Sequence, residues 1–113
     1  MTNEQIEKKF KFDMNMRRFI TDDAGMFFFK TRDTLKYKNL FILLTNIGFR
    51  DGSDEAIKHF PNEYSTSYIW FSNEYNSYTT GHISVRTEAA FKYFNEIPDY
   101  LLEYTKLNMG CKL

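Results

Sequence analysis

The sequence predicts an α+β fold, built as a small antiparallel sheet of three to four strands with a main helix, at about 34–47, on one face. Two stretches carry this prediction. Residues 26–49 combine a short apolar run with a helix-period stripe that ends in glycine. Residues 64–85 alternate between apolar and polar positions around a polar turn, which is typical of a hairpin. Short helices are expected near the C-terminus.

Length and composition indicate one folded domain. The chain has 113 residues, of which 42% are hydrophobic and 27% charged, an ordinary balance for a globular protein. A domain of this size buries roughly 65% of the surface that its unfolded chain exposes, so it can fold without disulfides or metals. We therefore expect a single domain over 1–113, with 1–9 as a loose arm and 108–113 as a frayed tail.

The N-terminal part fits two interpretations. Thr2 can cap a helix, and Ile6 and Phe10 lie at helical spacing. From Phe10 to Met16, however, apolar and polar residues alternate as in a strand. We expect a short helix or loose arm over 3–9 and a strand near 10–20, and a continuous helix through Phe19 is the alternative. The turn DDAG then follows.

The stretch 26–49 should organise the fold. Its first part, MFFFKT, is a strand with bulky apolar residues in a row, which suits a strand covered on both sides or nearly so. The helix that follows can be capped by Thr31, Asp33 or Thr34, and Gly48 is the expected left-handed stop. The positions that should face the core are Tyr37, Leu40, Phe41, Leu44 and Ile47.

The second half predicts a hairpin and two short helices. The strands should be 67–72 and 78–85, joined by the turn NEYNS at 73–77. Thr87 can cap a short helix TEAAFKYF, and Pro98 suits the first turn of a last helix.

Alternation gives this hairpin two faces, because successive side chains of a strand point to opposite sides. One set is apolar and should face the core: Ile69, Phe71, Ile83 and Val85. The other set is aromatic and hydroxyl-bearing: Tyr68, Trp70, Tyr78, Thr80, His82 and Ser84. We predict binding residues Tyr68, Trp70, Tyr78 and His82, with Tyr64 and Tyr75 at the rim. This surface could bind a partner protein or a second copy of the chain. It could also be covered by another part of the chain, or stack nucleic-acid or nucleotide bases.

Charge adds a second candidate surface. Basic and acidic side chains number 15 each, so the net charge is zero and there is no overall attraction to nucleic acid. Residues 1–50 nevertheless carry a positive excess, and 51–113 a negative one. The possible contacts to phosphate or to an acidic partner, around the start of the main helix, are Lys30, Arg32, Lys36 and Lys38. A nucleic-acid or nucleotide-binding module is therefore the alternative function, and a solvated charged face is the plainer interpretation.

No pattern indicates catalysis, a metal site or a cofactor. Cys111 is the single cysteine, and with His59 and His82 it lacks the paired spacing of a zinc site. Asp22 and Asp23 are adjacent in a turn, where consecutive side chains usually point apart. No signal-peptide pattern and no apolar run of membrane-spanning length are present. We expect a cytoplasmic protein that is not an enzyme and has no membrane partner.

Composition and layout resemble the small orphan early proteins of T-even-type bacteriophages. The similar features are the residues of AT-rich codons and the pattern FFFKTRDTLKYKNLFILLTNIGF, followed by YIWFSNE and YTTGHISV, within residues 26–85. The resemblance implies a host-takeover or anti-defence protein in the host cytoplasm, and it carries over no catalytic residues. Our hypothesis is thus a phage-encoded interaction protein that binds a host protein stoichiometrically and can also form homo-oligomers.

Overall fold

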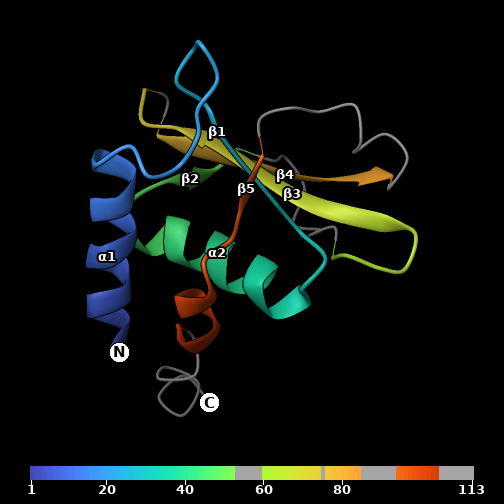
Figure 1. Cartoon of the computed structure of the whole chain (residues 1–113), viewed down its shortest axis with the longest axis horizontal. Coiled ribbons are helices and arrows are strands. Elements are labelled where there is room, and N and C mark those ends of the chain that lie inside the picture. Colours follow the sequence, from blue (N-terminus) through green and yellow to red (C-terminus); the bar gives the residue numbers. More distant parts are fainter. Residues whose placement is uncertain (53–59, 75, 85–93, 105–113) are drawn as a thin grey trace.

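A computed structural model gives the fold of the chain and describes residues 1–52, 60–74, 76–84 and 94–104, with the backbone alone at 82–84 (Figure 1). The helices are α1 (Asn3–Asn15), α2 (Thr34–Asn46) and the 3-10 helix η1 (Asp99–Glu103). The strands are β1 (Phe27–Thr31), β2 (Arg50–Asp51), β3 (Ser65–Ser72), β4 (Ser77–Ser84) and β5 (Asn95–Glu96). Most of the predicted helix TEAAFKYF and the whole predicted tail at 108–113 lie outside the described residues.

The sheet has five strands in the order β2-β4-β3-β1-β5. Its centre is antiparallel, because β3 pairs with β1 on one side and with β4 on the other. The outer strands β2 and β5 have two residues each and pair parallel to β4 and β1. The α+β class and the hairpin are confirmed. The predicted antiparallel sheet of three to four strands is present in the centre as β1, β3 and β4. The parallel edge strands β2 and β5 were not predicted, because strands of two residues leave no periodic signal.

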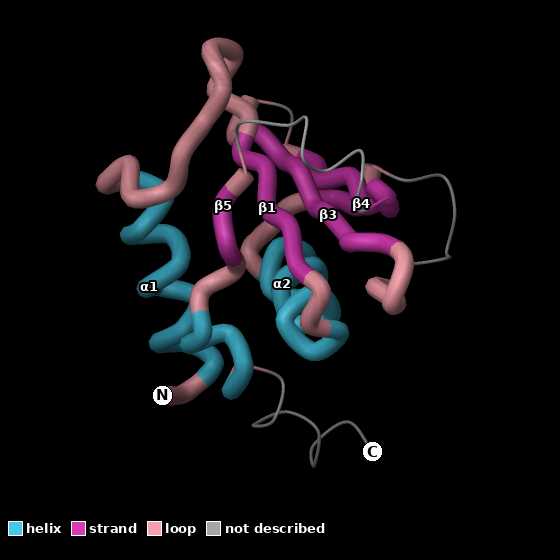
Figure 2. The backbone as a smooth tube through the Cα atoms, turned by 45° about the vertical axis from the view of Figure 1, so that its right-hand side comes forward, coloured by secondary structure: helices cyan, strands magenta, loops and turns pink. Residues whose placement is uncertain are grey.

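Both α1 and α2 lie on one side of the sheet, below the strands in Figure 1, and Figure 2 shows the same arrangement from another side. Phe71 of β3 is fully buried at the centre of this side. Its ring centroid lies 6.3 Å from that of Phe10 in α1 and 5.8 Å from that of Phe29 in β1. Phe49, which follows α2, completes the cluster at 5.2 Å. We call this side the helix side of the sheet and the opposite side its outer face.

Residues 3–15 form one helix. The helix expected over 3–9 is therefore present, and the alternative of a continuous helix holds as far as Asn15. The predicted loose arm over 1–9 and the predicted strand near 10–20 are wrong. The Thr2 hydroxyl accepts from the Gln5 amide at 3.1 Å, and the Gln5 side chain accepts from the Thr2 amide at 2.8 Å, a complete capping box. Ile6 and Phe10 are fully buried, whereas Phe12 is 51% exposed. The helical period therefore overrides the alternation after Phe10, because the core lies along one stripe of a helix.

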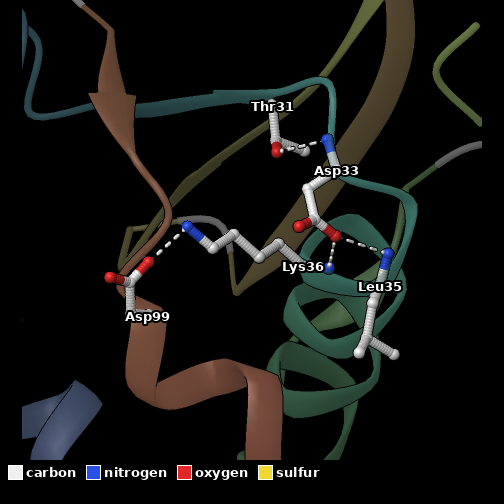
Figure 3. Close-up of polar contacts among 5 residues, drawn as sticks. All are labelled: Thr31, Asp33, Leu35, Lys36 and Asp99. Carbon is white, nitrogen blue, oxygen red and sulfur yellow. Dashed lines mark hydrogen bonds and ion pairs between the residues drawn. The ribbon is translucent and has the colours of Figure 1, made fainter.

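The start of α2 follows its local signals, as Figure 3 shows. The Asp33 carboxylate accepts from the backbone amides of Leu35 at 2.9 Å and Lys36 at 3.0 Å, so Asp33 is the cap. The Lys36 ammonium reaches across to the carboxylate of Asp99, at the start of η1. This contact holds the beginning of α2 against the C-terminal part of the described chain.

Asn39 is a buried polar residue that the predicted apolar stripe of α2 did not include. Its side chain is fully buried, and its amide nitrogen donates to the Leu101 carbonyl of η1 at 2.6 Å. The buried Asn39 amide thereby has an acceptor on η1, and the same Leu101 carbonyl also accepts from the Tyr104 backbone amide at 3.0 Å. The predicted last helix after Pro98 is present as η1, with Leu101 fully buried.

Two tyrosines after β5 tie η1 to α1. Tyr100 donates its hydroxyl proton to the Asp13 carboxylate at 2.8 Å, and Tyr104 donates to Glu7. The amide of Asn46 in α2 also donates to the Tyr104 hydroxyl, at 2.8 Å. Burial, followed by these carboxylate contacts, raises the pKa of Tyr100 and of Tyr104 well above the usual tyrosine range.

The two long helices end in the same hydrogen-bonding motif but with different residues. After α2, the Phe49 amide donates to the Leu44 carbonyl at 2.9 Å, and Gly48 adopts a φ of 111°. After α1, the Arg18 amide donates to the Asp13 carbonyl at 2.9 Å, and Arg17 adopts a φ of 56°. Glycine takes this left-handed conformation without a Cβ clash, but arginine does not.

We predict opposite effects of glycine at these two helix ends. Gly48→Ala should lower the free energy of unfolding by about 1 kcal/mol or more, because alanine is strained at this φ. Arg17→Gly should raise it by about 0.5–1 kcal/mol, because it removes the same kind of strain. Urea unfolding followed by the fluorescence of Trp70 measures both changes. A loss of stability in Arg17→Gly would contradict this account.

We also predict that stability falls in alkali. The hydroxyls of Tyr100 and Tyr104 have a higher pKa in the folded protein than in the unfolded chain, where the tyrosine pKa is about 10. Their contribution is therefore complete below about pH 10 and is lost as the pH rises above it. Urea midpoints at a series of pH values should show this fall, and Tyr100→Phe together with Tyr104→Phe should flatten it. Tyr64→Phe, at an exposed ring, is the control that should keep the wild-type fall.

Candidate functional site

The outer face of the sheet carries a row of aromatic side chains. Phe28 comes from β1, Tyr68 and Trp70 come from β3, and Phe94 immediately precedes β5. Their side chains are all half-buried. We call these four residues the outer aromatic row. Both long helices pack on the other side, so no helix of the described part of the chain lies over this row.

The rings of the row contact one another in sequence. Tyr68 and Trp70 stack with a centroid distance of 4.7 Å and an interplanar angle of 10°. Trp70 and Phe28, which are register partners across β3 and β1, have centroids 6.3 Å apart. Phe28 then meets Phe94 edge to face at 6.2 Å. These geometries are favourable for aromatic pairs and fix the rings before any partner binds.

Tyr68 also covers the backbone of the neighbouring strand. Its register partner in β4 is Gly81, and a Cβ at Gly81 would lie only 2.6 Å from the Tyr68 hydroxyl oxygen. The tyrosine ring thus occupies the space that any larger residue at 81 would need. Burial raises the pKa of the Tyr68 hydroxyl above its usual value. The absence of a side chain at Gly81 is what allows this end of the row to lie flat on the sheet.

Tyr78 does not belong to this face, contrary to the sequence prediction. The register pairs Tyr78 with Phe71, and directly paired residues of antiparallel strands share a face. Tyr78 is therefore on the helix side, only 2% exposed, with its hydroxyl 2.8 Å from the Thr45 hydroxyl of α2. The turn between Ser72 and Ser77 contains an even number of residues, so partner positions differ in parity. The prediction assumed equal parity, and that assumption also misplaced Thr80, which pairs with Ile69.

The other predicted residues of the hairpin are spread out. Tyr64 is 76% exposed and lies just before β3. The backbone of His82 pairs with that of Ser67, and its side chain lies outside what the structure describes. Tyr75 also lies outside the described residues. Of the predicted set, Tyr68 and Trp70 are the pair that the structure brings together.

The four predicted basic residues do not share one contact region. Lys30 is on the outer face, with its ammonium 5.8 Å from the centroid of the Phe94 ring. The Arg32 guanidinium donates to the carbonyl oxygens of Asn62 and Glu63 at 3.2 and 2.9 Å. Lys36 pairs with Asp99, and Lys38 is half-buried on α2. Lys30, Arg32 and Lys36 are thus engaged in contacts within the chain, which leaves less charge for a phosphate.

Phe28 and Phe94 are the members of the row that sequence reasoning missed. A signal for Phe28 was present, because a run of adjacent apolar residues in one strand places bulky rings on both of its faces. Phe94 is the last residue of the predicted helix TEAAFKYF, where the sequence does not indicate a place in the sheet. Its contact with Phe28 depends on the pairing of β5 with β1. The side-chain amide of Asn95 also donates to the Phe28 carbonyl at 3.1 Å, although the two residues are 67 positions apart in the sequence.

Other kinds of site find no support in the described residues. Among them, no group of three or more histidine, cysteine, aspartate or glutamate side chains is arranged to hold a metal ion. No helix within the described ranges has the length and hydropathy needed to cross a bilayer. No family model, no curated protein and no solved structure matches the chain.

We predict that Gly81 and Tyr68 are energetically coupled. Gly81→Ala should destabilise the protein by about 1–3 kcal/mol, because the new methyl group must displace the Tyr68 ring. In a Tyr68→Ala background the same change should be neutral or stabilising by up to about 1 kcal/mol, because glycine weakens a strand interior. A double-mutant cycle of unfolding free energies measures the difference. Equal effects in both backgrounds would show that the ring does not occupy this space.

Proposed function

We propose that the chain is a non-enzymatic interaction protein that binds another protein through its outer aromatic row. One observation carries the proposal: four aromatic side chains of three segments contact one another on the face away from the helices. Tryptophan and tyrosine are enriched among the residues that dominate binding energy at protein interfaces. Half-buried rings can still gain contact area when a partner covers them.

The mutual contacts of the rings support a binding role because they reduce its entropic cost. A partner that docks on loose side chains must immobilise each of them, at about 0.5–1.5 kcal/mol per side chain. Tyr68 and Trp70 are already stacked, and Phe28 and Phe94 are held edge to face. The surface is thus preorganised across β3 and β1 and at the start of β5.

The resemblance to phage early proteins supplies the proposed class of partner. Proteins of that kind act inside an infected bacterium by engaging host components in fixed ratio. We therefore propose a host protein as the partner and the host cytoplasm as the place of action. A second copy of the chain is a further candidate partner, and light scattering of the purified protein tests for it.

A nucleic-acid partner is the second candidate function. Lys30 favours this function, because its ammonium lies beside the aromatic row. A base could stack on a ring of the row while the adjoining phosphate contacts the lysine. Three observations weigh against it: the zero net charge, the Arg32 contacts to carbonyl oxygens, and the Lys36–Asp99 pair. Proteins that bind nucleic acid through phosphates usually present several uncommitted cations.

We predict that Trp70→Ala weakens binding of the partner at least about tenfold, the size of a typical hot-spot loss. The partner is captured from a bacterial lysate and purified, and its Kd is then measured for the wild type and the variant. Phe12→Ala is the matched control, since it removes a ring that is 51% exposed on α1, and it should change the Kd less than about twofold. Tyr68→Ser is a second test of the row if Trp70→Ala folds poorly.

Three results would contradict the proposal. The first is an unchanged Kd in a folded Trp70→Ala or Tyr68→Ser variant. The second is an equal loss in Phe12→Ala. The third is a Kd that rises steeply with salt and is shared by single-stranded DNA or RNA, which would favour the nucleic-acid function instead.

A further inference from the structure

A hollow of about 510 Å³ lies where the end of α1, the 17–25 loop and the β3–β4 turn meet. Its apolar lining residues are Met14, Phe19 and Phe27, and Asn15 and Asn73 also line it. The volume is in the range of about 300–1,000 Å³ that is usual for small-molecule sites. None of the four residues of the outer aromatic row lines this hollow.

Arg17 provides a cation at the helix end of the hollow. It lines the hollow, and within the described part of the chain it has no hydrogen bond or ion pair through its guanidinium. The adjacent Arg18 differs, because it pairs with Asp13 at 3.5 Å and lies over the Phe12 ring. Arg17 also adopts a left-handed φ of 56°, in a position where glycine would be less strained. The side chain thus lies at this site despite a conformational cost and without an internal partner.

Asp23 provides a carboxylate on the turn side of the same hollow. Its neighbour Asp22 is used by the turn itself, because it accepts from the amides of Ala24 at 3.0 Å and Met26 at 2.9 Å. Asp23 lines the hollow and is exposed, with no side-chain hydrogen bond or ion pair among the described residues. The two adjacent carboxylates therefore have different roles, and only that of Asp23 is available to a ligand.

We propose that this hollow binds a short peptide with free termini. A guanidinium binds a carboxylate in a forked geometry, so Arg17 would hold the C-terminal carboxylate. Asp23 would hold the N-terminal ammonium. The apolar lining of Met14, Phe19 and Phe27 would receive an apolar side chain, and the amides of Asn15 and Asn73 would pair with the peptide backbone. The volume suits a ligand of about two or three residues.

This ligand class uses all the chemical features of the hollow. A simple anion such as phosphate would engage Arg17 but would leave Asp23 and the apolar lining without a role. An apolar molecule would leave both charges unpaired beside it, at a cost in desolvation. A zwitterion with an apolar centre pairs each charge with its opposite. The proposal is independent of the outer aromatic row, so failure of either leaves the other standing.

The test is a titration of the full chain with the tripeptide Ala-Phe-Ala, followed by two-dimensional amide NMR. The free tripeptide should produce saturable shifts of the Thr21 and Asn73 amides, with a Kd below about 10 mM. Amidation of its C-terminus or acetylation of its N-terminus should each weaken binding at least about fivefold, because each removes one charge-assisted contact. Inorganic phosphate is titrated in parallel.

The variants assign each terminus to its residue. In Arg17→Gly the free and C-amidated tripeptides should bind equally weakly, and in Asp23→Asn the same should hold for the free and N-acetylated tripeptides. Asn76→Gly is the matched control for Arg17→Gly, because Asn76 is the other described non-glycine residue with a left-handed φ, 51°, and it does not line this hollow. It should bind the free tripeptide as the wild type does.

Several outcomes would overturn the proposal. They are the absence of saturable shifts, equal binding of the blocked and free tripeptides, and unchanged binding in Arg17→Gly. Phosphate that shifts the same amides while the tripeptide does not would show a plain anion site instead. Because Arg17→Gly is expected to be more stable than the wild type, a loss of binding in this variant would not be explained by unfolding.

Discussion

The core of the protein forms where α1 and Phe49, which follows α2, pack around Phe71 of β3. The fully buried ring meets Phe10 of α1, Phe29 of β1 and Phe49 after α2. Once both helices occupy this side, the alternate side chains of β1 and β3 must point away from them. The aromatic character of those strands therefore appears on two faces, as core on one and as the outer aromatic row on the other.

The first and last described elements complete this core through polar contacts. Asp13 and Glu7 of α1 accept from Tyr100 and Tyr104, and the amide of Asn39 in α2 donates to a carbonyl of η1. These contacts join segments far apart in the sequence, and they place α1 in the folded body. Buried polar groups require such partners, so the position of η1 is set by hydrogen bonds as well as by apolar packing.

The ends of α1 and α2 show how one backbone motif can serve different purposes. Gly48 closes α2 without strain and lets Phe49 turn into the core. Arg17 closes α1 in the same left-handed conformation, and its charged side chain lines a hollow beside the Asp22–Asp23 turn. Strained residues persist where the surrounding structure holds them, and their clustering at binding sites makes the α1 end a reasonable place for a ligand.

The elements with local signals could be predicted from the sequence alone. Asp33 and Gly48 mark the start and the end of α2. The polar turn between two alternating runs marks the β3–β4 hairpin. The face of the sheet on which each side chain lies depends instead on strand register and on long-range pairing. The even number of residues in the hairpin turn moved Tyr78 into the core, and the pairing of β5 with β1 brought Phe94 to Phe28. Local propensity does not encode register or long-range pairing, because both depend on contacts between segments that only the folded chain brings together.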